Sequence, residues 1–147
     1  MNLQDLLAQG RLRRRSTRKE EIRGLLQVAD RDLGDAAVPR LSSDRLFLIA
    51  YEAALTLATI PLRCTGYETY GSGHHWTTFL ALPLTMGEEL HDLSIYLESC
   101  RNKRNVGAYD RSGSISPSEA SELVEEAKAF NGRLRQWLRE KFPELAD

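Results

Sequence analysis

The sequence predicts an all-α protein, an antiparallel up-and-down bundle of four to five helices. Apolar residues recur at the three- and four-residue spacing of one helical face along most of the 147 residues. Ser, Thr and Pro stand where these stretches begin, as is typical of helix N-termini. No stretch shows the alternation of apolar and polar residues that indicates a half-buried strand. Long amphipathic segments with short connections therefore favour a helical bundle.

Two regions are expected: an N-terminal arm with a basic link over residues 1–16, and the helical bundle over residues 17–147. Leu3, Leu6 and Leu7 predict a short helix that docks on the bundle. The run Arg11–Arg15, which contains four arginines, predicts an exposed basic link.

The first bundle helix is expected to begin at Thr17, because Thr17 and Glu20 have the spacing of a capping box. Gly34 is expected to end it in the left-handed conformation. A second helix is expected from Ser42 or Ser43, with Pro61 kinking or ending it, because the proline ring clashes with the carbonyl four residues back. Its alanines predict close approach by neighbouring helices: Ala50, Ala53, Ala54 and Ala58.

Residues 65–73 contain three glycines and no helical stripe, which predicts a loop. A short third helix is expected over residues 75–84. Thr85 and Glu88 have a second capping-box spacing, which predicts the start of a fourth helix running to about Ala108.

The final helix has the strongest start signal in the sequence. Ser116 is a typical N-cap residue, Pro117 occupies the first helical position and Glu119 completes a capping box. Pro143 is expected to stop this helix.

Composition excludes several classes of protein. Twenty Lys and Arg residues against 21 Asp and Glu give a net charge of -1, which excludes a generally cationic nucleic-acid binder but allows a local basic patch. We expect no membrane span and no secretion signal. Cys64 and Cys100 are expected to be reduced and buried, so a cytoplasmic location is predicted. The three histidines lack a metal-ligand arrangement, and we expect no metal and no cofactor.

The candidate site is the segment of residues 101–110, at the end of the fourth helix. The apolar stripe of this helix continues into Arg104, and Arg101 lies beside the same stripe. Half-buried arginines need acidic or anionic partners. One reading pairs Arg104 internally with Asp110 or with a carboxylate of another helix. The other is a phosphate-contacting cleft, because the planar guanidinium suits phosphate oxygens.

In that cleft, Asn102 and Asn105 would add neutral hydrogen bonds, and Tyr109 would stack on a base. Lys103, between the two arginines, is a further candidate for RNA or partner binding. A second basic cluster precedes and enters the first bundle helix, either as a solvated face or in contact with RNA: Arg11, Arg13, Arg14, Arg15, Arg18, Lys19 and Arg23.

These motifs resemble the HEPN superfamily. The resemblance rests on Arg-Asn-Lys-Arg-Asn at residues 101–105, Ala-Tyr-Asp at 108–110, and the Ser-x-x-Glu-Ala start of the last helix. Ile-Ala-Tyr-Glu-Ala-Ala at residues 49–54 and Gly-His-His at 73–75 also fit small prokaryotic members. The resemblance covers about residues 17–142.

The resemblance implies a homodimeric helical bundle. Many members are metal-independent ribonucleases whose Arg-polar-x-x-x-His motifs meet across the dimer. There the arginine stabilises the charged phosphorane, and the histidine handles the proton of the ribose 2′-hydroxyl. Others are toxins paired with a nucleotidyltransferase antitoxin, or binding modules. Arg101 and Asn102 match the start of the motif, but no histidine follows. Tyr109 does not replace it, because a phenol is a poor general base at neutral pH.

Three hypotheses follow. The first is an RNA-binding or nucleotide-partner-binding component of a toxin–antitoxin or defence module, a homodimer with a degenerate motif. The second is a metal-independent endoribonuclease toxin in which Arg101, Asn102 and Arg104 are catalytic, with His75 of a partner protomer as one source of the proton-transfer group. The third is a non-catalytic dimeric scaffold whose arginines form internal ion pairs. The dimer is expected to form through the second and fourth helices.

Overall fold

The computed structural model describes residues 1–109 and 114–146, with the side chains of residues 106–109 excepted. The protein is mostly helical, which confirms the all-α class, and the described residues contain one two-stranded sheet. The elements in chain order are α1 (Leu3–Ala8), β1 (Leu12–Arg14), α2 (Lys19–Asp35), α3 (Ser43–Cys64), β2 (Tyr67–Thr69), α4 (His74–Leu80), α5 (Leu82–Met86), the 3-10 turn η1 (Glu88–Leu90), α6 (His91–Tyr109) and α7 (Pro117–Lys141).

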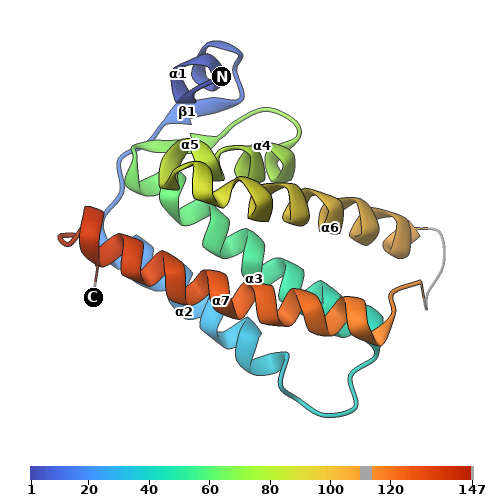
Figure 1. Ribbon diagram of the computed structural model, residues 1–147. Coiled ribbons are helices and arrows are strands. Elements are labelled where there is room, and N and C mark those ends of the chain that lie inside the picture. The colour runs from blue at the N-terminus through green and yellow to red at the C-terminus, as the bar shows by residue number, and fades with distance from the viewer. Residues whose placement is uncertain (110–113, 147) are drawn as a thin grey trace.

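Helix α3 is the centre of the fold and contacts α2, α4, α5, α6 and α7. Helices α2 and α7 pack along one side of α3, whereas α4, α5 and α6 pack along the other (Figure 1). The alanines expected to allow close approach are all buried: Ala50, Ala53, Ala54 and Ala58. The small side chains let neighbouring helices lie against α3 from several directions, which places its one buried tyrosine, Tyr51, deep in the molecule.

By length and composition alone, α3 is apolar enough to cross a membrane. More than half of its most apolar window is buried against the other helices. The core helix of a soluble protein has the same properties, so this helix is compatible with a soluble protein.

Three of the predicted helix boundaries are wrong. Helix α2 has Arg18 as its N-cap residue, and Thr17 donates its hydroxyl to the Glu21 carboxylate (3.1 Å) in place of capping the helix. Gly34 lies within α2 and keeps a negative φ. Helix α6 begins at His91 and not at Thr85, because α5 and η1 occupy the preceding residues.

The signals at Ser42 and Ser116 are confirmed. The Ser42 hydroxyl accepts a hydrogen bond from the Arg45 amide at the start of α3. At the start of α7, Ser116 and Glu119 form the complete capping box. Pro61 does not end α3, which continues to Cys64.

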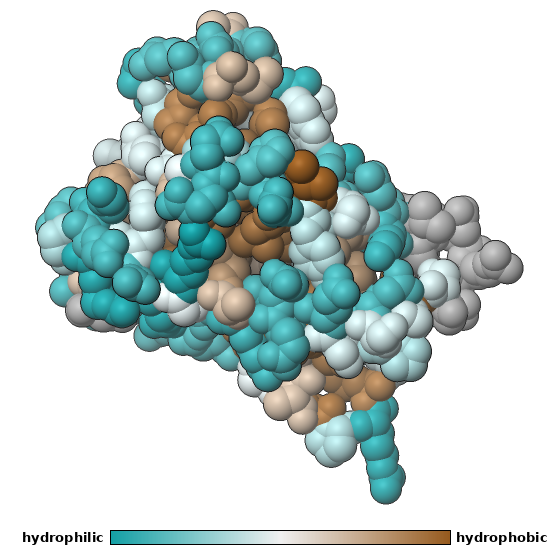
Figure 2. Space-filling view, in the orientation of Figure 1, coloured by the Kyte–Doolittle hydropathy of each residue, from teal (hydrophilic) through white to brown (hydrophobic). Residues whose placement is uncertain are grey.

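The segment expected to be an exposed basic link contains β1, and the segment expected to be a loop contains β2. The two strands pair antiparallel, with Leu12 opposite Thr69 and Arg14 opposite Tyr67. Beneath them lies a small apolar cluster, separate from the main core: Leu6, Leu12, Leu62, Tyr67 and Ala81. Figure 2 shows apolar surface between this N-terminal segment, at the top, and the helices below it. The sequence did not reveal the strands because three residues are too few to show alternation.

Candidate functional site

Arg104 projects from α6 towards α3 and is half-buried. Its Nη2 lies 3.5 Å from the Glu52 Oε1, a long ion pair, and its guanidinium carbon lies 5.3 Å from the centre of the Tyr51 ring. The Nε atom is buried and has no hydrogen-bond partner among the described residues. A buried N–H without an acceptor is costly, so this guanidinium is only partly satisfied by the protein.

Tyr51 connects Arg104 to His75. The Tyr51 hydroxyl and His75 Nδ1 are 2.9 Å apart, and the two rings lie 5.8 Å apart between centroids. Phe79, one turn along α4 from His75, packs edge-on against Tyr51 at 5.9 Å. Burial raises the pKa of the Tyr51 hydroxyl above its ordinary value, despite the nearby arginines, so the hydroxyl stays protonated at neutral pH.

His75 is held in its neutral form. Burial lowers the pKa of His75, and the positive charge of Arg104 lowers it further, whereas Glu52 partly opposes both effects. A neutral imidazole with Nδ1 engaged by Tyr51 has Nε2 as its second polar atom, and Nε2 has no hydrogen-bond partner among the residues that the structure describes. His75 therefore has the protonation state of a proton acceptor.

Arg101 is bound more tightly by the protein than Arg104 is. Its Nε lies 2.5 Å from the Glu98 Oε1 and its Nη2 lies 3.1 Å from the Glu98 Oε2, a two-point interaction within α6. The hydrogen bond to Glu98 raises the pKa of Arg101. Both arginines thus have the internal carboxylate that the third hypothesis expects, but only Arg104 is held by a single long contact.

A pocket of about 250 Å³ opens beside Arg104, at the N-terminal end of α3. Its walls combine three cationic side chains, one carboxylate and three apolar side chains: Arg45, Lys103, Arg104, Asp44, Phe47, Leu48 and Ile115. The volume lies below the range of about 300–1,000 Å³ that small-molecule sites usually have.

The charges around this pocket are partly compensated. Lys103 Nζ lies 2.9 Å from the Glu119 Oε2, and this contact raises the pKa of Lys103. Arg45 is exposed and forms no ion pair with any residue within the described ranges. Because α3 begins at Ser43, the positive end of its helix dipole adds to these cations. The pocket therefore favours an anion.

The structure brings together only some of the predicted site residues. Lys103 and Arg104 line the pocket, and Arg101 lies one helical turn away against Glu98. Asn102 is exposed and Asn105 is half-buried, and neither lines this pocket. The side chain of Tyr109 and the whole of Asp110 lie outside the described residues.

Sequence reasoning missed the groups that surround Arg104. Tyr51 and Glu52 come from α3 and His75 from α4 of the same chain, so the imidazole is near the arginines without a partner protomer. His75 packs against an aromatic ring, that of Tyr51. The one available signal was Glu52, a charged residue within the alanine-rich core helix.

Comparisons with protein-family models, with curated proteins and with solved structures give no match to this chain. Within the described ranges, no group of three His, Cys, Asp or Glu side chains is placed to hold a metal ion.

Proposed function

We propose that this protein binds RNA, with a backbone phosphate held in the pocket between Arg45, Lys103 and Arg104. The observation that carries the proposal is the buried Nε of Arg104, which has no acceptor among the described residues and lies beside a cation-lined pocket. In this proposal the Arg104 side chain leaves the long contact to Glu52 and turns its N–H groups to a phosphate oxygen in the pocket. The chain's net charge of -1 confines such binding to a local site.

The resemblance to the HEPN superfamily supports the same ligand and adds the biological setting. In this proposal the protein is a homodimeric up-and-down bundle, located in the cytoplasm, in a toxin–antitoxin or defence module, with a nucleotidyltransferase as a partner. Helix α3 is buried within one protomer, so the proposed dimer contact lies on α6, where Ile95 is 57% exposed. The missing motif histidine favours binding over cleavage.

The test is the affinity of the purified protein for a fluorescently labelled single-stranded RNA at several salt concentrations. Arg45→Gln/Arg104→Gln should weaken binding about tenfold or more and make the slope of log K against log salt shallower by about 1.4, since two phosphate contacts are lost. The matched control is Arg31→Gln/Arg133→Gln, which removes two exposed arginines of α2 and α7. Equal effects of both pairs, or no effect of either, would contradict the proposal.

A metal-independent endoribonuclease is the second candidate, and the position of His75 favours it. His75 is neutral and lies in the field of Arg104 and Arg101. In this reaction the 2′-oxygen of a ribose attacks the adjacent phosphorus as His75 takes the 2′-hydroxyl proton. The bond to the 5′-oxygen then breaks, and that oxygen receives a proton from the imidazolium, which leaves a 2′,3′-cyclic phosphate and a 5′-hydroxyl. Arg104 would stabilise the charge on the phosphorane.

In the scaffold hypothesis the ion pairs of Arg101 and Arg104 are purely structural. If Arg101–Glu98 only stabilises α6 and Arg104–Glu52 only joins α6 to α3, replacing Arg104 lowers the stability of the fold, and RNA binding is absent from the wild-type protein. The RNA titration above therefore also separates the scaffold from the first two candidates.

A further inference from the structure

The β1–β2 ribbon concentrates arginines over aromatic rings. The guanidinium carbon of Arg11 lies 4.4 Å from the centre of the Trp76 ring, and that of Arg13 lies 5.0 Å from the Tyr70 ring. Arg14 lies 5.7 Å from Tyr67, its cross-strand partner. Significant cation–π pairs occur about once per 70–80 residues in proteins. Three of them within four consecutive positions are well above that density.

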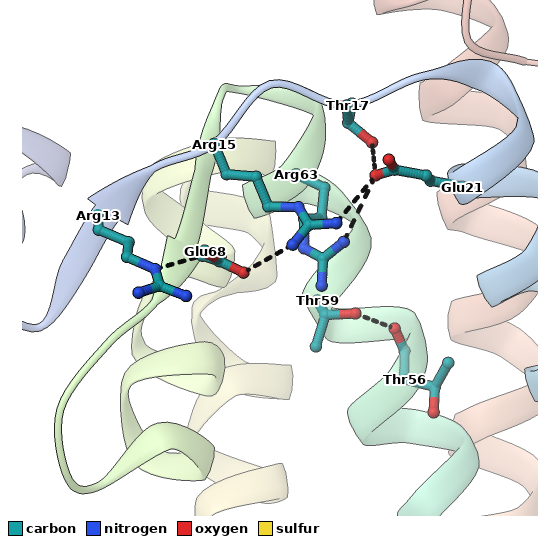
Figure 3. A network of polar contacts seen from close by, with 8 residues as sticks. All are labelled: Arg13, Arg15, Thr17, Glu21, Thr56, Thr59, Arg63 and Glu68. Carbon is teal, nitrogen blue, oxygen red and sulfur yellow. Dashed lines mark hydrogen bonds and ion pairs between the residues drawn. The ribbon is translucent and has the colours of Figure 1, made fainter.

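The ribbon is also richer in cations than in carboxylates. Figure 3 shows Arg13 and Arg15 on either side of Glu68, and Arg15 and Arg63 directed at Glu21. These contacts measure 2.7 Å from Arg13 and 3.2 Å from Arg15 to Glu68, and 3.4 Å from Arg15 and 3.8 Å from Arg63 to Glu21. Two carboxylates are thus shared among three arginines.

The arginines of the ribbon keep hydrogen-bonding capacity. Arg13 uses only Nε for Glu68, and its side chain is 58% exposed. Arg11 and Arg14 form no ion pair with any residue in the described part of the chain. A guanidinium stacked by one face on a ring still directs its N–H groups outward, where a phosphate can accept them.

Tyr70 adds a platform for a base. It follows β2 directly, and 51% of its surface is exposed even though the guanidinium of Arg13 lies near its ring. Single-stranded nucleic acids bind where aromatic rings stack with bases and cations follow the backbone. The combination of an exposed tyrosine with adjacent arginines is therefore better suited to single-stranded RNA than to an acidic protein, which needs no exposed ring.

The ribbon is connected to the Arg104 site by a continuous series of neighbours. Arg11 lies over Trp76, and Trp76 and Glu98 line one pocket of about 220 Å³ between α4 and α6. Glu98 in turn holds Arg101, one turn from Arg104.

We infer that Arg11, Arg13, Arg14 and Tyr70 form a second contact surface for single-stranded RNA, the arginine ribbon, which extends a strand held at the Arg104 pocket. The inference rests on the proposed function for its ligand class but on separate residues. It implies that a long RNA binds more tightly than a short one, because only a long strand reaches both surfaces.

The test compares labelled oligouridylates of 5 and 20 nucleotides. The shorter one is about the length of a single small binding site for single-stranded RNA, and the longer one is about the length of several. Arg13→Gln/Arg14→Gln should weaken binding of the long RNA about tenfold and leave binding of the short RNA unchanged. The control pair Arg31→Gln/Arg133→Gln should change neither. Tyr70→Leu should weaken binding of the long RNA about fivefold or more, whereas Tyr70→Phe, which keeps the ring, should not.

Each result bears on one of the two surfaces. If the long RNA binds the ribbon variants as it binds the wild type, while Arg45→Gln/Arg104→Gln loses binding, the ribbon inference is wrong and the proposed function stands. If only the ribbon variants lose binding, the pocket proposal is wrong, and the ribbon binds RNA by itself and does not extend a strand held at the pocket. Preference for duplex RNA, or equal losses in the control pair, overturns the ribbon inference, because neither requires stacking on Tyr70.

Discussion

Arg104 makes two weak contacts and leaves one donor unsatisfied. It lies over the Tyr51 ring, reaches Glu52 at 3.5 Å and buries an Nε that has no acceptor among the described residues. Partly exposed ion pairs of this kind contribute about 0–1 kcal/mol. An anionic ligand therefore has only a weak ion pair, that of Arg104 with Glu52, to displace before it binds this guanidinium.

The residue that decides between binding and cleavage is His75. We predict that His75→Ala abolishes any metal-independent RNA cleavage, because it removes the one neutral imidazole beside the arginines. The measurement is digestion of a defined single-stranded RNA in excess EDTA, with detection of 2′,3′-cyclic phosphate ends.

His74→Ala is the matched control, because His74 is exposed and its side chain lies outside the Tyr51 contact. Cleavage that persists in His75→Ala at the wild-type rate would exclude His75 from the reaction. Absence of cleavage in the wild type would leave RNA binding and the scaffold, which the RNA titration separates.

At the scale of single elements, the start of α7 ties two helices together. The Ser116 hydroxyl accepts from the Glu119 amide, the Glu119 carboxylate accepts from the Ser116 amide, and Lys103 of α6 also contacts that carboxylate. These interactions, led by the Ser116 backbone, lower the pKa of Glu119 to about 2. The helix cap and Lys103 in the wall of the pocket beside Arg104 thus share one carboxylate.

The Glu119 contribution to stability should depend on pH. Because the pKa of Glu119 is depressed in the folded state, its contribution is present above about pH 4.5 and is lost as the pH falls towards 2. Glu119→Gln should therefore be less stable than the wild type at pH 7 and equal to it near pH 2. Ser116→Ala should cost about 0.5–2 kcal/mol at pH 7.

The measurement is urea unfolding followed by circular dichroism across this pH range. Glu126→Gln removes an exposed carboxylate of the same helix and is the matched control. A Glu119→Gln variant that differs from the wild type by the same amount at pH 2 and pH 7 would show that the cap does not titrate.

The helix signals that failed did so for local reasons. Thr17 donates its hydroxyl to Glu21, which the neighbouring arginines also engage, so Arg18 takes the N-cap position without a side-chain cap. Thr85 donates back to the Ala81 carbonyl within α5. The chain then turns at Gly87, whose φ of +110° is rarely adopted by other residues, before η1 and α6.

At the scale of the whole molecule, the sequence predicts which segments are helical but not which side chains meet. The apolar stripes and the Ser116 signal identify the long helices, because each depends on residues close in the chain. His75 and Tyr51, and Arg13 and Glu68, are brought together only by packing of segments far apart in sequence. Arg101 and Arg104 could be identified from the sequence because they continue an apolar stripe. The residues that Arg104 contacts could not, because they lie on another helix.

The central claim is that Arg104 exchanges Glu52 for an RNA phosphate. The measurement that tests it most directly is the dissociation constant of a short single-stranded RNA for Glu52→Gln, beside the wild type and Glu140→Gln, which removes an exposed carboxylate at the far end of α7. Glu52→Gln should bind RNA about two- to fivefold more tightly, the scale of a partly exposed ion pair, and Glu140→Gln should not. Unchanged or weaker binding by Glu52→Gln would show that Arg104 is a structural ion pair and not the RNA contact.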